Sequence, residues 1–132
     1  MSTRGEFGFV DSDGVIHSIY VHCDAYPEGL GYELLTKAAT AHDALDYTLN
    51  YLQETSEEIR VFYDVDSYKH EVIDLDREFI YLFVNDKWYV YSTYFNPLDL
   101  GKWSNASGDA IPFFRIYLHN DKPKIDLIDT FA

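Results

Sequence analysis

One long run of helical periodicity divides a chain that otherwise alternates like a series of strands. Between residues 27 and 55, apolar side chains recur at intervals of three and four, with polar side chains between them. Thr40 and Asp43 have the spacing of a capping box, with Asp in place of the usual Glu or Gln. We therefore predict two helices, over about 27–39 and 41–55, or one helix with a kink. The recurring apolar positions are Leu30, Leu34, Ala38, Ala41, Leu45, Leu49 and Leu52.

Before this run, residues 6–24 have the pattern of a hairpin. Residues 7–10 predict a short strand, residues 11–14 a turn in which Gly14 supplies a positive φ, and residues 15–24 a longer strand. Alternate side chains of a strand point to opposite faces. One face of the longer strand therefore carries Tyr20, His22 and Asp24. The other, which we expect to face the core, carries Val15, His17, Ile19, Val21 and Cys23.

The second half of the chain is dominated by strand patterns. Residues 79–84 are apolar on both faces, as in a central strand, and residues 85–86 form a turn into 87–95, which completes a hairpin. Turn-forming residues fill a loop over 96–110, with Trp103 available to pack it. The other expected strands cover residues 59–65, 71–75, 113–118 and 125–128.

Strands, then helices, then strands joined by hairpins predict an α+β fold. We expect an antiparallel sheet of about 5–7 strands with one or two helices, over about 27–55, packed on one face. A length of 132 residues suits a single domain covering 1–132.

The charge of the chain limits its partners. With 23 acidic and 10 basic residues, the formal net charge is -13, which disfavours direct binding to nucleic acid or to an anionic membrane. A basic protein surface would be attracted. The single cysteine, Cys23, excludes an intrachain disulfide and indicates a reducing compartment. No leader opens the chain and no run approaches ~18 apolar residues, so we expect a soluble, cytoplasmic protein.

Few residues have the spacing of a catalytic or metal site. His22 and Asp24 could form a base with its orienting carboxylate, or two metal ligands, but hydrogen bonding between strand end and helix start is the favoured explanation. Asp11 and Asp13 resemble the start of a calcium loop, yet no later ligands follow. Cys23 lies on an apolar face, which favours a buried thiol. We predict no metal site, no cofactor and no catalytic residue.

Carboxylates cluster in two stretches of the sequence. Evenly spaced carboxylates on rigid elements can mimic a row of phosphates and occupy a basic groove, although a solvated face explains such runs as well. Six tyrosines nearby, at positions 63, 68, 81, 89, 91 and 94, suit either a binding face or a sheet. The predicted interaction surface comprises Asp64, Asp66, Glu71, Asp74, Asp76, Glu78, Glu54, Glu57 and Glu58.

The first third of the chain resembles a family of small proteins from bacteriophages, prophages and other mobile elements. Members begin MSTR and carry a segment like YxHWDGYPxGVGxxLL. This chain begins Met1-Ser2-Thr3-Arg4, and residues 19–35 match most of that segment. Cys23 stands where the family usually has Trp, and Ala25 where it usually has Gly. The shared polar residues are Tyr20, His22, Asp24, Tyr26 and Arg4.

The resemblance implies a source rather than a chemistry, because the family has no established activity. Small acidic phage proteins often inhibit host machinery. We therefore predict an interaction protein that binds and inhibits a basic host protein, such as a CRISPR or restriction system, with DNA mimicry as one route. One alternative is a small enzyme or ligand-binding domain that uses the His22/Asp24/Tyr26 junction or an N-terminal Ser2. Another is a structural or self-associating protein, and the oligomeric state is left open.

Overall fold

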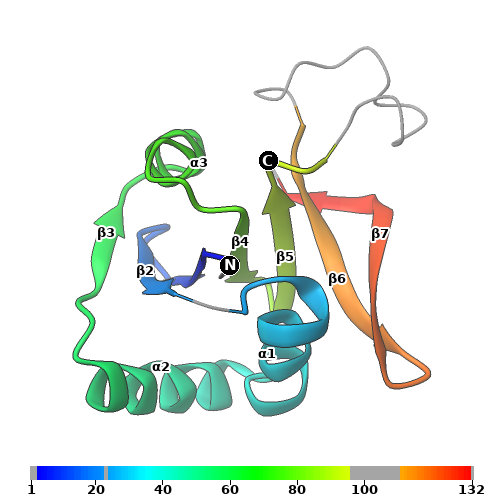
Figure 1. Ribbon diagram of the computed structural model, residues 1–132, viewed down its shortest axis with the longest axis horizontal. Helices are drawn as coiled ribbons and strands as arrows, with labels where there is room; N and C mark the ends of the chain where they lie inside the picture. The colour runs from blue at the N-terminus through cyan, green and yellow to red at the C-terminus, as the bar shows by residue number, and fades with distance from the viewer. Residues whose placement is uncertain (1–2, 23, 96–110, 132) are drawn as a thin grey trace.

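The computed structural model describes residues 3–22, 24–95 and 111–131. Within these ranges the strands form one sheet in the order β3-β2-β1-β4-β5-β6-β7 (Figure 1). The strands are β1 (Gly5–Val10), β2 (Ile16–Val21), β3 (Arg60–Phe62), β4 (Phe79–Val84), β5 (Lys87–Ser92), β6 (Phe113–His119) and β7 (Lys122–Phe131).

The two hairpins expected from the sequence are confirmed. β1 and β2 pair antiparallel, with Gly5 opposite Val21 and Val10 opposite Ile16. β4 and β5 pair antiparallel across Asn85 and Asp86, whose φ angles of 55° and 61° are those of a tight hairpin turn. The last strand is longer than the expected 125–128, because β7 runs from Lys122 to Phe131. The loop predicted over 96–110, with Trp103, lies outside the described residues.

One strand pair differs from the antiparallel arrangement that we expected. β1 and β4 are parallel, with Gly5 opposite Phe79 and Phe9 opposite Phe83. This pair joins the N-terminal hairpin to the C-terminal half of the sheet, so the sheet is mixed. The long connection between β1 and β4 makes a parallel pairing possible, since parallel strands need a crossover of a dozen or more residues.

The two predicted helices cover one face of the sheet. The first begins with a single π-helical turn, η1 (Pro27–Gly31), and continues as α1 (Tyr32–Lys37). The second is α2 (Ala41–Thr55), and the Thr40 hydroxyl accepts a hydrogen bond of 3.1 Å from the backbone N–H of Asp43. The bounds of the second helix and the Thr40 cap were therefore predicted correctly, whereas the first helix ends at Lys37, before the predicted residue 39.

A third helix replaces the strand expected over 71–75. It is α3 (Val65–Asp74), and it lies on the face of the sheet opposite α1 and α2 (Figure 1). Asp64 caps it, because its carboxylate accepts 2.8 Å and 2.9 Å hydrogen bonds from the Ser67 backbone N–H and hydroxyl. Tyr68 and Val72, one turn apart, are fully buried beneath it. The strand over 59–65 accordingly shrinks to the three residues of β3.

Two apolar clusters fill the space on either side of the sheet. The cluster under α1 and α2 includes Leu34, Ala38 and Trp88, and the indole N–H of Trp88 donates a 2.8 Å bond to the Ala38 carbonyl. The cluster under α3 includes Tyr68 and Phe113, whose rings stack at 6.2 Å. Because both faces are covered, β2 is buried on both sides. Ile19 and Val21 face the core as expected, but Ile16 and Ser18, on the opposite face, are buried as well.

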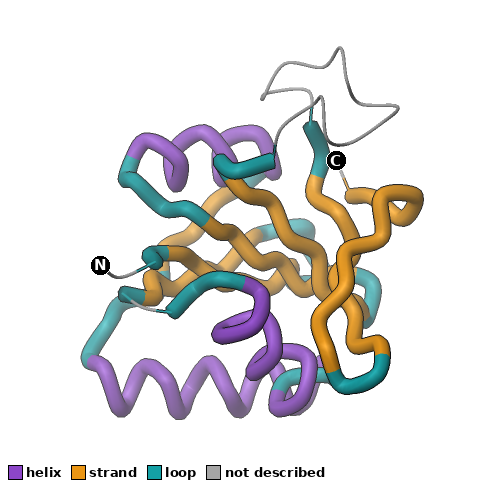
Figure 2. The backbone as a smooth tube through the Cα atoms, turned by 45° about the vertical axis from the view of Figure 1, so that its right-hand side comes forward, coloured by secondary structure: helices purple, strands orange, loops and turns teal. Residues whose placement is uncertain are grey.

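The far edge of the sheet is poorly suited to pairing with another chain. β7 contains Pro123, and its register against β6 shifts between Phe114 and Arg115, so the strand bends (Figure 2). The Asp126 carboxylate also accepts a 2.9 Å hydrogen bond from the backbone N–H of Ile128. Proline, bulges and bends blunt edge strands. Edge-to-edge self-association through β7 is therefore disfavoured. No helix in the described ranges is long and apolar enough to cross a bilayer.

Candidate functional site

A buried ionic cluster centred on Glu6 organises the edge of the sheet that β3 forms. Glu6 lies in β1 and its side chain is fully buried. Its carboxylate is paired with the guanidinium of Arg60 in β3 and accepts a 3.2 Å hydrogen bond from Nε of Arg77. Ser18 donates a further 2.7 Å bond to it, and the Tyr68 hydroxyl lies 2.9 Å from the Ser18 oxygen. The cluster thus ties β1, β2, β3 and α3 together.

Three basic side chains of this region, Arg60, Lys69 and Arg77, are directed inward, whereas Arg4 is exposed and lines a cavity with Asp76 and Glu78. Arg60 and Arg77 both contact Glu6, and the Arg77 guanidinium also lies 3.9 Å from the centroid of the Tyr20 ring. Lys69, on α3, is buried and donates a 2.6 Å hydrogen bond to the carbonyl of Ile111. Residues 54–78 contain three lysines and arginines, and all three make these inward contacts.

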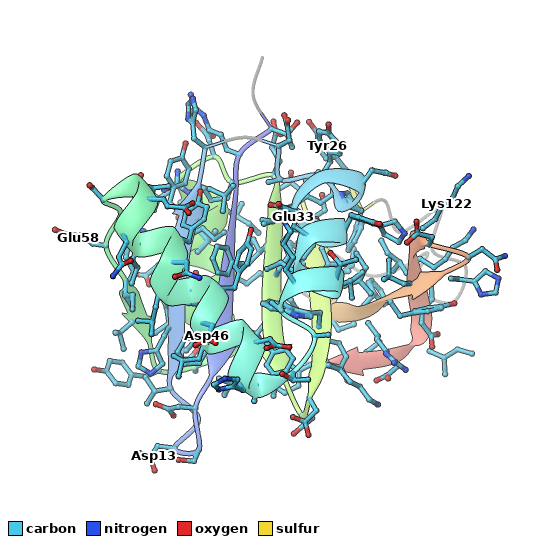
Figure 3. The ribbon with its side chains drawn as sticks, turned by 90° about the horizontal axis from the view of Figure 1, so that it is seen from below. Asp13, Tyr26, Glu33, Asp46, Glu58 and Lys122 are labelled. Atoms are coloured by element: carbon cyan, nitrogen blue, oxygen red, sulfur yellow. The ribbon has the colours of Figure 1, made fainter. Side chains whose placement is uncertain are left out.

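The predicted acidic residues surround this cluster. Glu54 lies in the last turn of α2, Glu57 and Glu58 lie in the connection from α2 to β3, and Figure 3 shows Glu58 at the outer edge of the molecule. Asp64, Asp66, Glu71 and Asp74 belong to α3 or its cap, and Asp76 and Glu78 lie between α3 and β4. All are exposed except Glu57 and Glu78, which are half-buried. We call these nine carboxylates the β3 acidic surface.

The structure brings the two stretches of carboxylates into one electrostatic environment. Burial lowers the pKa of the Arg77 guanidinium, whereas the carboxylates of Glu57 and Asp76 raise it. Burial likewise lowers the pKa of Arg60, and Glu71 raises it. Glu57 belongs to the stretch after α2, and Asp76 and Glu71 belong to the stretch around α3. Carboxylates from both stretches therefore act on Arg77.

The strand-to-helix junction does not form the base and orienter pair considered from the sequence. His22 is exposed, and its Nδ1 lies 3.0 Å from the Tyr20 hydroxyl. Asp24 is also exposed, and no hydrogen bond within the described ranges joins it to His22. Tyr26 is 38% exposed. Arg4 is exposed as well, and it lines a cavity of about 590 Å³ with Arg77, Glu78 and Tyr94 among others.

A pocket of about 370 Å³ lies beside the junction. The Tyr47 and Tyr51 rings, 6.4 Å apart, form one wall, and both also pack edge-on against Phe7. The Tyr47 hydroxyl donates a 3.0 Å bond to Glu33, and burial and that carboxylate raise the pKa of the phenol. The lining comprises Val21, Asp24, Glu28, Gly29, Leu30, Tyr32, Glu33, Tyr47 and Tyr51. This junction pocket is therefore aromatic and acidic.

The local sequence explains how the junction turns so tightly. Pro27 stands at the first position of the helical turn, where its missing N–H costs nothing. A Cβ on Gly29 would lie 2.4 Å from the Asp24 carbonyl oxygen, so a side chain cannot be placed there without moving the backbone. The Leu30 N–H donates a 2.9 Å bond to that same carbonyl. Gly29 therefore lets the helical turn close against Asp24.

Several candidates from the sequence yield no site in the described part of the chain. No group of three or more His, Cys, Asp or Glu side chains there could hold a metal ion. Asp11 serves as a turn residue, accepting backbone bonds from Asp13 and Val15 and contacting His17 at 2.9 Å. Ser2 and Cys23 lie outside the described residues.

Two parts of the site were missed by sequence reasoning. The ionic cluster was missed because Glu6 and Arg77 are 71 residues apart in sequence. The one available signal was a carboxylate inside an otherwise apolar strand, between Gly5 and Phe7. The aromatic wall was missed because Tyr47 and Tyr51 look like ordinary helix-surface residues at i and i+4.

Comparisons of the chain with protein-family models, with curated proteins and with solved structures gave no match.

Proposed function

We propose that this chain is a non-enzymatic interaction protein that binds a basic protein through the β3 acidic surface. The observation that carries the proposal is the inward direction of Arg60, Lys69 and Arg77, which leaves the carboxylates facing solvent. Such a surface attracts a basic partner, speeds the encounter and repels nucleic acid. The net charge of -13 adds a negative electrostatic potential around the molecule as a whole.

The partner class that we favour is a nucleic-acid-handling protein, because its binding groove is basic. Carboxylates from α2, the α2–β3 connection and α3 would approach such a groove as the phosphates of a duplex do. The resemblance of residues 1–4 and 19–35 to small phage proteins points to a host defence system as the target and to inhibition as the outcome. The partner would then be a bacterial, cytoplasmic protein.

Charge reversal on α3 is expected to abolish this interaction. The Glu71→Lys/Asp74→Lys variant replaces two exposed carboxylates near the helix C-terminus, where lysine is compatible with the helix dipole. The formal charge rises from -13 to -9, since each change adds two units. In a pull-down from bacterial lysate at about 0.1 M salt, the wild type should retain a basic nucleic-acid-handling protein. The variant should lose it, as should the wild type at about 0.5 M salt.

The matched control is Asp24→Lys/Glu28→Lys, which changes the charge by the same amount at the junction pocket. It should retain the partner. Equal retention by the α3 variant and the wild type would contradict the proposal. Loss of the partner only with the control variant would move the site to the junction.

A second candidate function is the binding of a small organic cation in the junction pocket. The lining of this pocket favours it: tyrosine rings and carboxylates together recognise ammonium groups, and the lining contains no lysine or arginine. In an NMR titration, n-butylammonium should perturb Tyr47 and Tyr51 and bind about tenfold tighter than n-butanol. Tyr51→Leu should remove the difference. Equal binding of the two compounds would exclude a cation site.

A further inference from the structure

Large apolar side chains that remain exposed gather along α2 and β3. Leu45 and Leu49 lie one turn apart on α2, and Ile59, Val61 and Tyr63 alternate along the edge strand and its flanks. Their exposed fractions range from 39% for Ile59 to 78% for Tyr63. Scattered exposed apolar residues are ordinary, but a contiguous group of them commonly marks an interaction site.

The strand pairing and a shared cavity connect Val61 on the edge strand to Leu45 on α2. Val61 lies opposite His17 on β2, and His17 lies opposite Phe9 on β1, with the two rings stacked at 5.0 Å. Phe9 in turn lines a cavity of about 350 Å³ together with Leu45. A continuous row therefore runs from α2 across three strands to the edge of the sheet. We call this surface the α2–β3 face; it comprises Phe9, Leu45, Leu49, Ile59, Val61 and Tyr63.

The alternation of β3 explains why this surface is uncovered. Arg60 pairs with Ser18, and Phe62 belongs to the cluster under α3, so both point to the α3 side of the sheet. Val61, between them, therefore points to the side occupied by α2, and Ile59 and Tyr63 are the residues that flank β3. Residues on the α3 side of β3 find partners in the core, whereas Val61 and Tyr63 remain exposed.

The charges around this face are negative. Asp86 lines the cavity with Leu45, and Figure 3 shows Asp46 on α2 and Glu58 just beyond its end. His17 is engaged by Asp11, and Arg60, on β3 itself, is directed to Glu6 on the other side of the sheet. A second copy of the chain, at -13, and an anionic lipid surface would both be repelled.

We infer that the α2–β3 face docks a basic amphipathic segment of the partner protein. The apolar side chains of that segment would contact Leu49, Val61 and Tyr63, and its lysines or arginines would face the surrounding carboxylates. This inference rests on the proposed function and deepens it. The β3 acidic surface would attract the partner, and the α2–β3 face would bind the segment that anchors it. Apolar anchors surrounded by charge are the usual arrangement of a protein interface.

A pair of synthetic peptides tests the inference. One is a helical peptide of leucine and lysine with leucines at i, i+3, i+4 and i+7; the other has serine at every leucine position. The wild type should bind the leucine peptide at least about tenfold tighter, and the leucine peptide should shift NMR signals of Leu49, Val61 and Tyr63. Val61→Ser/Tyr63→Ser should remove the tenfold preference.

The control variant is Tyr94→Ser/Ile128→Ser, which removes an exposed aromatic and an exposed aliphatic side chain elsewhere. It should keep the preference. Equal binding of the two peptides to the wild type, or equal loss in both variants, would overturn the inference. So would a dimer in light scattering that Val61→Ser/Tyr63→Ser dissociates, because the occupant would then be a second copy. The same peptides test the proposed function separately. Glu71→Lys/Asp74→Lys should weaken the binding of both peptides, whereas Val61→Ser/Tyr63→Ser should remove only the preference for the leucine peptide.

Discussion

Replacing Glu6 by alanine is expected to lower the free energy of unfolding by about 2–4 kcal/mol. The substitution leaves Arg60 and Arg77 facing each other without the carboxylate that now holds both. It also removes the acceptor of the 2.7 Å bond from Ser18, whose hydroxyl is fully buried. Breaking a fully buried ion pair costs about 3–5 kcal/mol. We expect less because the two guanidinium groups are 15% and 35% exposed and can regain water.

Urea unfolding followed by circular dichroism measures this change directly. Glu28→Ala is the matched control, because Glu28 is exposed, and its free energy of unfolding should stay within about 0.5 kcal/mol of the wild type. Glu6→Gln should lie between the two, since it keeps an acceptor for Ser18 but not the charge. A loss below about 1 kcal/mol for Glu6→Ala would show that the cluster does not stabilise this edge of the sheet.

Replacing Gly5 by alanine is expected to destabilise the protein by about 2–3 kcal/mol. A Cβ at this position would lie 2.4 Å from the Phe79 carbonyl oxygen and 2.5 Å from the Ala25 Cβ. Gly5 lies opposite Phe79 in the parallel β1–β4 pair. Two residues earlier, the carbonyl of Thr3 accepts a 2.9 Å hydrogen bond from the Ala25 N–H. The new methyl group must therefore push the junction away from the centre of the sheet.

Gly14→Ala separates this steric cost from the general cost of losing a glycine. Gly14 has open space around its Cβ position but a φ of 81°, so only backbone strain of about 1 kcal/mol is expected. The difference between the two variants in chemical denaturation reports the clash at Gly5. Equal losses would mean that the Ala25 segment moves aside without cost. In the Gly5 variant we also expect the amide of Ala25 to exchange faster, because its bond to Thr3 would weaken.

Features of the fold that depend on residues close together in sequence were predicted, whereas features that depend on contacts between distant residues were not. The boundaries of α2 were predictable because its apolar periodicity and its cap, Thr40, are local in sequence. α3 was missed because its apolar positions, Val65, Tyr68 and Val72, sit in a stretch whose other half resembles a strand. Its cap, Asp64 with Ser67, was a signal that could have been weighed. The parallel β1–β4 pair left no local signal, since strand direction depends on a crossover of some seventy residues.

The candidate site divides in the same way. Tyr20, His22, Asp24, Tyr26 and Arg4 were recognisable as one polar group because most of them are close in sequence, but of these five only Asp24 lines the junction pocket. The carboxylates of the β3 acidic surface were recognisable as a list. The sequence did not show whether neighbouring basic side chains neutralise these carboxylates, because the partner of Arg60 and Arg77 is a carboxylate in the first strand of the chain.

The amino-acid sequence by itself determined the α+β class, the two hairpins, the helices of residues 27–55 and a net charge of -13, because each depends on local pattern or composition. Only the tertiary structure decided the parallel β1–β4 pair, the helix on the second face and the burial of Glu6. It also directed the arginines inward and left Leu49, Val61 and Tyr63 exposed along one face. These features arise from contacts between distant segments, whose geometry is set by how the sheet and its helices pack together.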